Sequence, residues 1–161
     1  MWPGAARGEH IMLVIRVLDG EEMGVPDALV ELWQADADGK YNHPDDLQHR
    51  LFDPAFYEFG RLATDQNGEM MFECMRPARV RGIDGVLQAP YISVHTFCRG
   101  TPRHVSTQVY FANDLANAED PILKLVPSNR GSTLLASANP REQGAWRINL
   151  HLCGEGETAF F

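Results

Sequence analysis

The sequence has few cysteines, and their spacing argues against two common ways of holding a small domain together. Cys74, Cys98 and Cys153 are an odd number, and no two of them form a C-x-x-C pair. A disulfide framework or a zinc site is therefore not expected, and the free thiols fit a reducing compartment. We expect a cytoplasmic protein.

Basic charge and long apolar runs are also lacking. Lys and Arg total 14 against 22 Asp and Glu, which gives a net charge of −8. Nucleic acids and anionic membranes attract clustered basic residues, so neither is expected as a partner. The longest early apolar run, residues 11–18, is interrupted by Arg16. It is too short to cross a bilayer and is not placed like a signal peptide.

Signatures of common catalytic sites are missing too. The sequence contains no G-x-S-x-G, no G-x-x-x-x-G-K-[ST] and no G-x-G-x-x-G that follows a strand. The histidines show neither the i,i+2 nor the i,i+4 spacing expected of a metal-binding pair on one element. They are His10, His43, His49, His95, His104 and His151. We therefore expect no complete catalytic or metal site on this chain alone.

Short apolar runs alternate with turn residues along the whole chain, a rhythm that favours a β-sandwich or barrel. Strands are predicted at residues 11–18, 28–34, 69–74, 91–97, 106–111 and 146–152. The last has a period of two, with Trp146, Ile148 and Leu150 on one face. The prediction is a single domain, residues 1–161. It is an all-β, immunoglobulin-like or prealbumin-like sandwich with long loops and little helix.

Local patterns also predict a turn, a helix and a long loop in the segments that connect the strands. Asn67-Gly68, between apolar flanks, favours a hairpin turn of type I′, in which both central residues have positive φ. Residues 128–136 form the one helix candidate, with Ser128 as its N-cap. Residues 42–59 show no period and are predicted to be a long functional or partner-binding loop.

Two side chains are candidates for binding or catalysis. Tyr41 follows a strand and stands beside the polar loop, where a structural role is the alternative. Arg99 ends a predicted strand just before Gly100, and alternation places it on one face with Tyr91, Ser93 and Phe97. A guanidinium there either binds a carboxylate through two parallel hydrogen bonds or forms a salt bridge at the rim.

Several segments, in order, resemble the intradiol ring-cleaving dioxygenases. They are residues 31–44 (ELWQADADGKYNHP), 59–65 (FGRLATD), 88–94 (QAPYISV), 97–100 (FCRG) and 154–161 (GEGETAFF). The resemblance is strongest to the α subunits of the members that cleave protocatechuate. It implies a β-sandwich, Fe(III) held by two tyrosines and two histidines, and insertion of both atoms of O2 into a catechol ring.

The resemblance places the four iron ligands on identifiable positions of this sequence. The first tyrosine falls on Tyr41, whereas the second falls near Val80 and is absent. The two histidines fall on Tyr91 and Ser93, so neither imidazole is present. The resemblance therefore implies that this chain binds no iron, and an iron-binding homo-oligomer is rejected.

A chain of this kind implies a partner. In the two-subunit members a β subunit holds Fe(III), and the active site lies at the interface between the subunits. The resemblance places Arg99 at the edge of that pocket, where it holds the carboxylate of a protocatechuate-like catechol. The expected state is a hetero-oligomer with a β subunit. The family's N-terminal segment is absent, which leaves a stand-alone, non-catalytic scaffold or binding module as the alternative.

Overall fold

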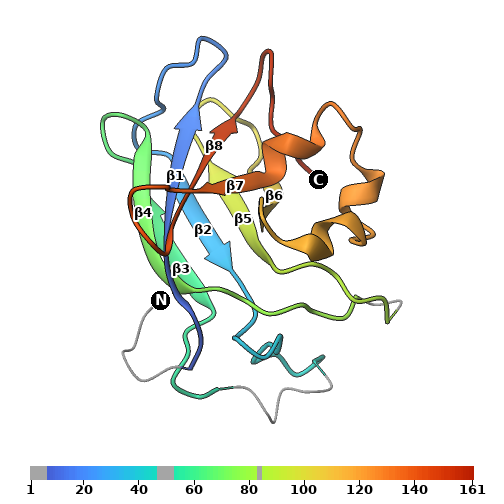
Figure 1. Ribbon diagram of the computed structural model, residues 1–161. Coiled ribbons are helices and arrows are strands. Elements are labelled where there is room, and N and C mark those ends of the chain that lie inside the picture. The colour runs from blue at the N-terminus through green and yellow to red at the C-terminus, as the bar shows by residue number, and fades with distance from the viewer. Residues whose placement is uncertain (1–6, 47–52, 83–84) are drawn as a thin grey trace.

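A computed structural model describes residues 7–46, 53–82 and 85–161, and eight strands lie within these ranges (Figure 1). In chain order the strands are β1 (His10–Leu18), β2 (Leu29–Trp33), β3 (Phe59–Ala63), β4 (Glu69–Met75), β5 (Tyr91–Phe97), β6 (Val105–Phe111), β7 (Leu135–Ala138) and β8 (Ala145–His151). The described residues also form three short 3-10 helices: η2 (Leu115–Ala118), η3 (Leu123–Leu125) and η4 (Gly131–Leu134).

The strands form two layers that are joined along β7. Strand order is β3-β2-β5-β6-β7-β8-β1-β4, so β3, β2, β5 and β6 make one layer and β8, β1 and β4 make the other. β7 pairs in parallel with β6 and antiparallel with β8, through two residue pairs on each side. β1 lies between β4 and β8 and is parallel to β8. The predicted all-β sandwich is confirmed.

Alternating side chains from both layers fill one core, as the period of two predicted. On β8 the buried residues are Trp146, Ile148 and Leu150, while Arg147 and Asn149 face outward. The facing layer contributes Val30 and Leu32 from β2 and Ile92 and Val94 from β5, among others.

The predicted strands at 11–18, 28–34, 69–74, 91–97, 106–111 and 146–152 all exist, with ends shifted by one residue at most. β3 and β7 were not predicted. The helix predicted at residues 128–136 is wrong: the chain makes the single 3-10 turn η4 and then enters β7. Parallel pairing with β6 extends residues 135–138, and no local pattern signals such a tertiary contact.

The type I′ turn at Asn67-Gly68 is also wrong. Gly68 has a φ of +74°, but Asn67 is not among the residues with positive φ. The Asp65 carboxylate accepts hydrogen bonds from the backbone N–H groups of Asn67 and Glu69 at 2.8 and 2.9 Å. This Asx-type capping stabilises a turn that leaves only Gly68 in the left-handed region. Because β3 and β4 belong to different layers, this turn connects the two layers and is not the turn of a β-hairpin.

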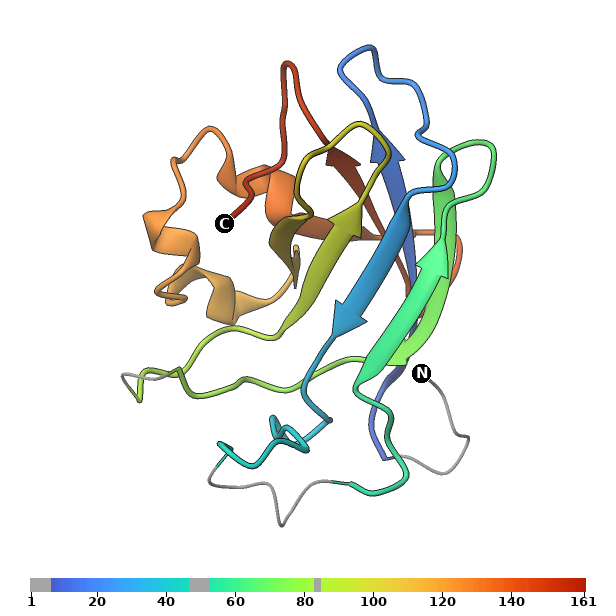
Figure 2. The same ribbon diagram turned by 180° about the vertical axis from the view of Figure 1, so that it is seen from behind.

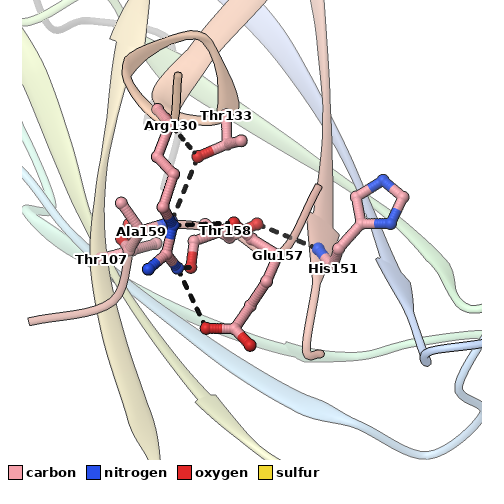
Figure 3. Close-up of polar contacts among 7 residues, drawn as sticks. All are labelled: Thr107, Arg130, Thr133, His151, Glu157, Thr158 and Ala159. Atoms are coloured by element: carbon pink, nitrogen blue, oxygen red, sulfur yellow. Dashed lines mark hydrogen bonds and ion pairs between the residues drawn. The ribbon is translucent and has the colours of Figure 1, made fainter. Parts of the chain in front are cut away.

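The C-terminal segment folds back along the free edge of β6. The guanidinium of Arg130 donates to the carbonyl oxygens of Glu157 and Thr158, at 3.3 and 2.6 Å, and to the Glu157 carboxylate at 3.0 Å (Figure 3). Thr107 Oγ1 donates to the Ala159 carbonyl, and Phe161 N donates to the Ser106 carbonyl. The segment therefore covers a strand edge that would otherwise be open for pairing.

The remaining features concern loops and thiols. Cys74, Cys98 and Cys153 are free. Residues 47–52 of the predicted loop 42–59, including His49, lie outside the described ranges. Among the residues that are described, no helix is long and apolar enough to cross a membrane.

Candidate functional site

The loop that carries Tyr41 is shaped by a buried carboxylate and a glycine. Asp36 Oδ1 accepts the backbone N–H groups of Asp38 and Lys40, both at 2.9 Å. Gly39 has a φ of +75°, and a Cβ there would stand 2.2 Å from the Arg79 carbonyl oxygen. Only glycine fits this position. The turn therefore fixes the backbone path that leads to Tyr41.

Tyr41 is held against the start of β5. Its hydroxyl donates to the Tyr91 hydroxyl at 3.4 Å, and its ring packs edge-on to Trp33 at 6.2 Å between centroids. Burial is the main cause that raises the pKa of Tyr41, and Tyr91, Glu58 and Asp46 raise it further. The site therefore favours a neutral phenol, whereas a ligand of Fe(III) must be a phenolate.

Tyr91 connects this cluster to Tyr110, which is fully buried. The rings of Tyr91 and Tyr110 lie 5.9 Å apart, and Tyr110 donates to Gln108 Oε1 at 2.7 Å. Its hydroxyl also contacts Asp120 Oδ1 at 3.3 Å, and burial together with that carboxylate raises the pKa of Tyr110. Three tyrosines thus form a row at one end of β5, in which Tyr41 is hydrogen-bonded to Tyr91 and the Tyr91 ring packs against Tyr110.

The other two of the four iron-ligand positions, Val80 and Ser93, also lack an imidazole. Val80 is buried in the segment that leads to β5, where its carbonyl accepts Gln88 N at 2.8 Å. Ser93 lies half-buried on the outer face of β5, beside Trp33 of β2 in the sheet register. The four positions therefore supply two phenols and one aliphatic hydroxyl. Ferric sites prefer anionic oxygen together with imidazole, so this donor set fits iron poorly.

Within the part of the chain that the structure describes, no cluster of histidines or carboxylates replaces the missing ligands. In ranges 7–46, 53–82 and 85–161, no three His, Cys, Asp or Glu side chains gather as a metal-binding group. A surface hollow of about 740 Å³ lies over β7 and β8, lined in part by Asn149 and His151. It is on the opposite layer from Tyr41, and Arg147 on its rim is paired with Glu69.

Tyr91 begins β5 and Arg99 follows its last residue, so Arg99 lies at the other end of this strand from the tyrosine row. Figure 2 shows β5, in yellow-green, crossing the layer beside β2. Its side chain is 85% exposed, and Nη2 pairs with Asp27 Oδ2 at 3.0 Å. An ion pair this exposed contributes little to stability, so the guanidinium is available for another anion. The structure does not bring Arg99 and Tyr41 together. From Tyr91 to Phe97, β5 makes six strand steps, which is about 20 Å, and Arg99 lies two residues further on in a turn.

Two aspartates that the sequence analysis did not single out hold the tyrosine row in place. Asp36 organises the turn before Tyr41, and the buried Asp120 accepts Ala89 N at 2.7 Å just before β5. Asp120 also caps the turn at Ile122 and Leu123, at 2.9 and 2.8 Å. The local signals are an Asp three residues before a glycine and an Asp-Pro pair, both typical of turns.

Comparison with known proteins identifies the family. Residues 1–152 match a family model described as "Dioxygenase". The chain is 38% identical to the protocatechuate 3,4-dioxygenase alpha chain of Pseudomonas putida over 160 residues, which is 97% of this chain and 77% of that protein. It is 32% identical to the beta chain of the Burkholderia cepacia enzyme over 145 residues, 88% of this chain and 62% of that one.

Solved structures agree in fold. The 3-chlorocatechol 1,2-dioxygenase of Rhodococcus opacus 1CP superimposes with a TM-score of 0.72 at 20% identity, over 92% of this chain and 60% of that chain. The structural similarity extends over the β-sandwich, and the similarity in sequence extends over nearly all of this chain. This chain belongs to the intradiol dioxygenase family.

Proposed function

We propose that this protein is the non-iron α-type subunit of a protocatechuate 3,4-dioxygenase, active only with an iron-bearing β subunit. The observation that carries the proposal is the content of the four ligand positions. Tyr41 is partly buried and hydrogen-bonded to Tyr91, and Val80, Tyr91 and Ser93 stand at the other three positions. Near-full-length similarity to an α chain supports the same assignment.

Iron and its chemistry then belong to the partner. Fe(III) on the β subunit would supply the step in which O2 cleaves the protocatechuate ring to β-carboxy-cis,cis-muconate. The residues of this chain contribute binding and not ring cleavage. The free thiols Cys74, Cys98 and Cys153 support a cytoplasmic location for the complex.

Arg99 is this chain's proposed contact with the substrate. The side chain projects from the end of β5 and is tied only to Asp27 and solvent by the contacts described. Its planar fork of N–H donors matches a carboxylate through two parallel hydrogen bonds. In the complex, the carboxylate of protocatechuate would take the place that Asp27 holds here. Arg99 would thus orient the ring from outside the iron's own ligand set.

The proposal is tested by metal analysis and oxygen uptake with protocatechuate, with and without a β chain. Alone, the protein should hold no stoichiometric iron and consume no O2. Together with a β chain it should give a coloured complex, from tyrosinate-to-iron charge transfer, that consumes O2. Iron near one equivalent per isolated chain would overturn the proposal. Failure to associate with a β chain would favour a stand-alone binding or scaffold module.

Arg99→Ala in the complex tests the role of the guanidinium. Loss of a charge-assisted, two-bond contact is worth about 1.5–3 kcal/mol. We therefore expect KM to rise roughly tenfold to a hundredfold, with a smaller change in kcat. Arg103→Ala is the matched control, because Arg103 is an exposed arginine of the same loop. Equal kinetics for the Arg99→Ala complex and the unmodified complex would refute this role.

A further inference from the structure

The ion pair between Arg99 and Asp27 follows from the way in which β2 and β5 pair. The two strands are antiparallel, and Leu29 stands opposite Phe97 at the end of the paired region. Asp27 lies two residues before Leu29, and Arg99 lies two residues after Phe97, so continuing the register sets one opposite the other. β2 and β5 run side by side in Figure 2. The contact of 3.0 Å between Nη2 and Oδ2 agrees with this register.

Asp27 has a backbone conformation that few side chains adopt. Its φ is +60°, in the left-handed region where most residues other than glycine are strained. Asp tolerates this region better than most residues do. A strained residue persists only where its surroundings fix it, and such residues cluster at functional sites. The conformation of Asp27 therefore indicates a role for its carboxylate.

The buried side chain of Thr64 fixes the turn that carries Asp27. Its hydroxyl donates to the Val25 carbonyl at 2.7 Å and accepts the Ala28 N–H at 2.9 Å. The backbone N–H of Thr64 donates to the Ala28 carbonyl at 2.9 Å. The backbone on both sides of Asp27 is thus held in place, so its carboxylate needs little ordering to meet Arg99.

A second turn fixes the backbone on the Arg99 side. Thr101 Oγ1 donates to the Cys98 carbonyl at 2.8 Å, and Thr101 N donates to the same oxygen at 3.4 Å. The side chains of Arg99 and Asp27 are 85% and 64% exposed. Two fixed turns therefore present an ion pair that stays open to solvent and to a ligand.

We propose that Asp27 is the resident counter-ion of Arg99 and competes with the carboxylate of the substrate for the guanidinium. This inference rests on the proposed function, in which Arg99 binds that carboxylate. While the site is empty, Asp27 keeps the guanidinium paired. When substrate binds, this pair has to break, so Asp27 weakens the binding of a carboxylated catechol by the strength of the pair. Asp27 acts on the substrate only through Arg99, as a positioning residue.

The competition has a consequence for the effect of salt. One ion pair, between Arg99 and Asp27, breaks as another forms between Arg99 and the substrate. Salt screens exposed pairs, so its effects on the two pairs offset each other. Affinity for a carboxylated catechol should therefore depend little on ionic strength while Asp27 is present. Without Asp27 the substrate adds an ion pair outright, and salt should weaken its binding.

The test compares Asp27→Asn with Glu22→Gln in the complex with a β chain. Asn has the size of Asp and also tolerates positive φ, so Asp27→Asn removes the charge and keeps the turn. Glu22 lies in the same loop between β1 and β2 and has a φ of +61°, so Glu22→Gln makes the same change in net charge outside the pair. Oxygen uptake gives KM for protocatechuate, and for catechol, which has no carboxylate, at low and high NaCl.

At low salt we expect Asp27→Asn to lower KM for protocatechuate about twofold to fivefold, the shift that an exposed ion pair gives, and Glu22→Gln to change it less than about twofold. Added NaCl should raise KM more in the Asp27→Asn complex than in the unmodified one. Catechol should show no such fall in KM. A rise in KM with Asp27→Asn would show that Asp27 supports the bound state, and it would overturn the competition. An unchanged KM, or an equal fall with Glu22→Gln, would overturn it as well.

Arg99→Ala separates this inference from the proposed function. Competition needs the guanidinium, so adding Asp27→Asn to Arg99→Ala should not lower KM further. If Arg99→Ala raises KM but Asp27→Asn lowers it equally with and without Arg99, only the inference is overturned. If Arg99→Ala leaves KM unchanged, the proposed role of Arg99 fails and the inference fails with it. A complex of the unmodified chain that consumes no O2 would overturn both. Circular dichroism checks the folding of each variant.

Discussion

Arg130 offers the sharpest test of how this fold holds its C-terminal segment. Its side chain donates three hydrogen bonds to residues 157 and 158, and Thr133 accepts Ala159 N at 3.1 Å in the same cluster (Figure 3). Thr158 is fully buried. Arg130→Ala would leave two backbone carbonyls without their charged donor, close to that buried residue.

The expected loss follows from the partners. A hydrogen bond from a charged donor contributes about 1.5 kcal/mol at the lower end of its range, and two such bonds end on the carbonyls of Glu157 and Thr158. The ion pair to the Glu157 carboxylate is 37% and 43% exposed on its two sides, so it contributes at most about 0.5 kcal/mol. Arg130→Ala should therefore lower the free energy of unfolding by about 3 kcal/mol.

In a chain of this size each kcal/mol shifts Tm by about 2–4 °C, so circular dichroism should show a fall of roughly 6–12 °C for Arg130→Ala. Amide exchange at Phe161, whose N–H bonds to Ser106, should accelerate as well. Glu157→Gln removes only the exposed ion pair and is the control, with a change below about 0.5 kcal/mol. If the free energy of unfolding of Arg130→Ala stays within about 1 kcal/mol of that of the unmodified protein, the contacts with the two carbonyls do not hold this segment.

Three further predictions concern buried or constrained groups. Asp120→Ala removes the acceptor of several N–H groups and should lower the free energy of unfolding, measured in urea, by about 3 kcal/mol. An unchanged free energy of unfolding would contradict the capping role. Gly39→Ala should cost more than Gly100→Ala, because both have positive φ but only Gly39 faces a carbonyl at 2.2 Å; equal midpoints in urea would contradict this. Burial raises the pKa of Cys74 to about 12 from 9.0, so the folded state favours its thiol and stability should fall between pH 9 and 12 in alkaline titration. A thiol reagent at pH 8 should modify exposed Cys153 but not Cys74 until the protein unfolds.

Elements whose inner side chains alternate were predictable from the sequence, and those defined by tertiary contacts were not. β1, β4, β5 and β8 each bury every second residue, so their period was visible. β3 was missed because it is an end strand and four of its five residues are exposed, which erases the alternation. β7 was missed because two pairs with β6 and two with β8 define it.

The same distinction holds for the candidate site: its residues could be found from local patterns, but the contacts between them could not. Tyr41 and Arg99 were found in the sequence, one beside a polar loop and the other at a strand end. Tyr41 follows the turn at Gly39, whereas Arg99 lies in a turn two residues beyond β5, where strand alternation no longer fixes its face. The hydrogen bond from Tyr41 to Tyr91 joins residues 50 positions apart, and no local pattern predicts it. The same is true of the ion pair from Arg99 to Asp27, because β2 and β5 become neighbours only in the folded sheet.

The pairing of β1 with β8 governs when this protein can finish folding during synthesis. Met12 pairs in parallel with Ala145, so β1 waits for a strand that is made 133 residues later (145 − 12). Until β8 leaves the ribosome, one edge of β1 has no strand to pair with and invites contact with other nascent chains. Such long-range parallel pairing is slow to form. Assembly with any partner that binds the finished sheets is therefore expected to follow the synthesis of β8.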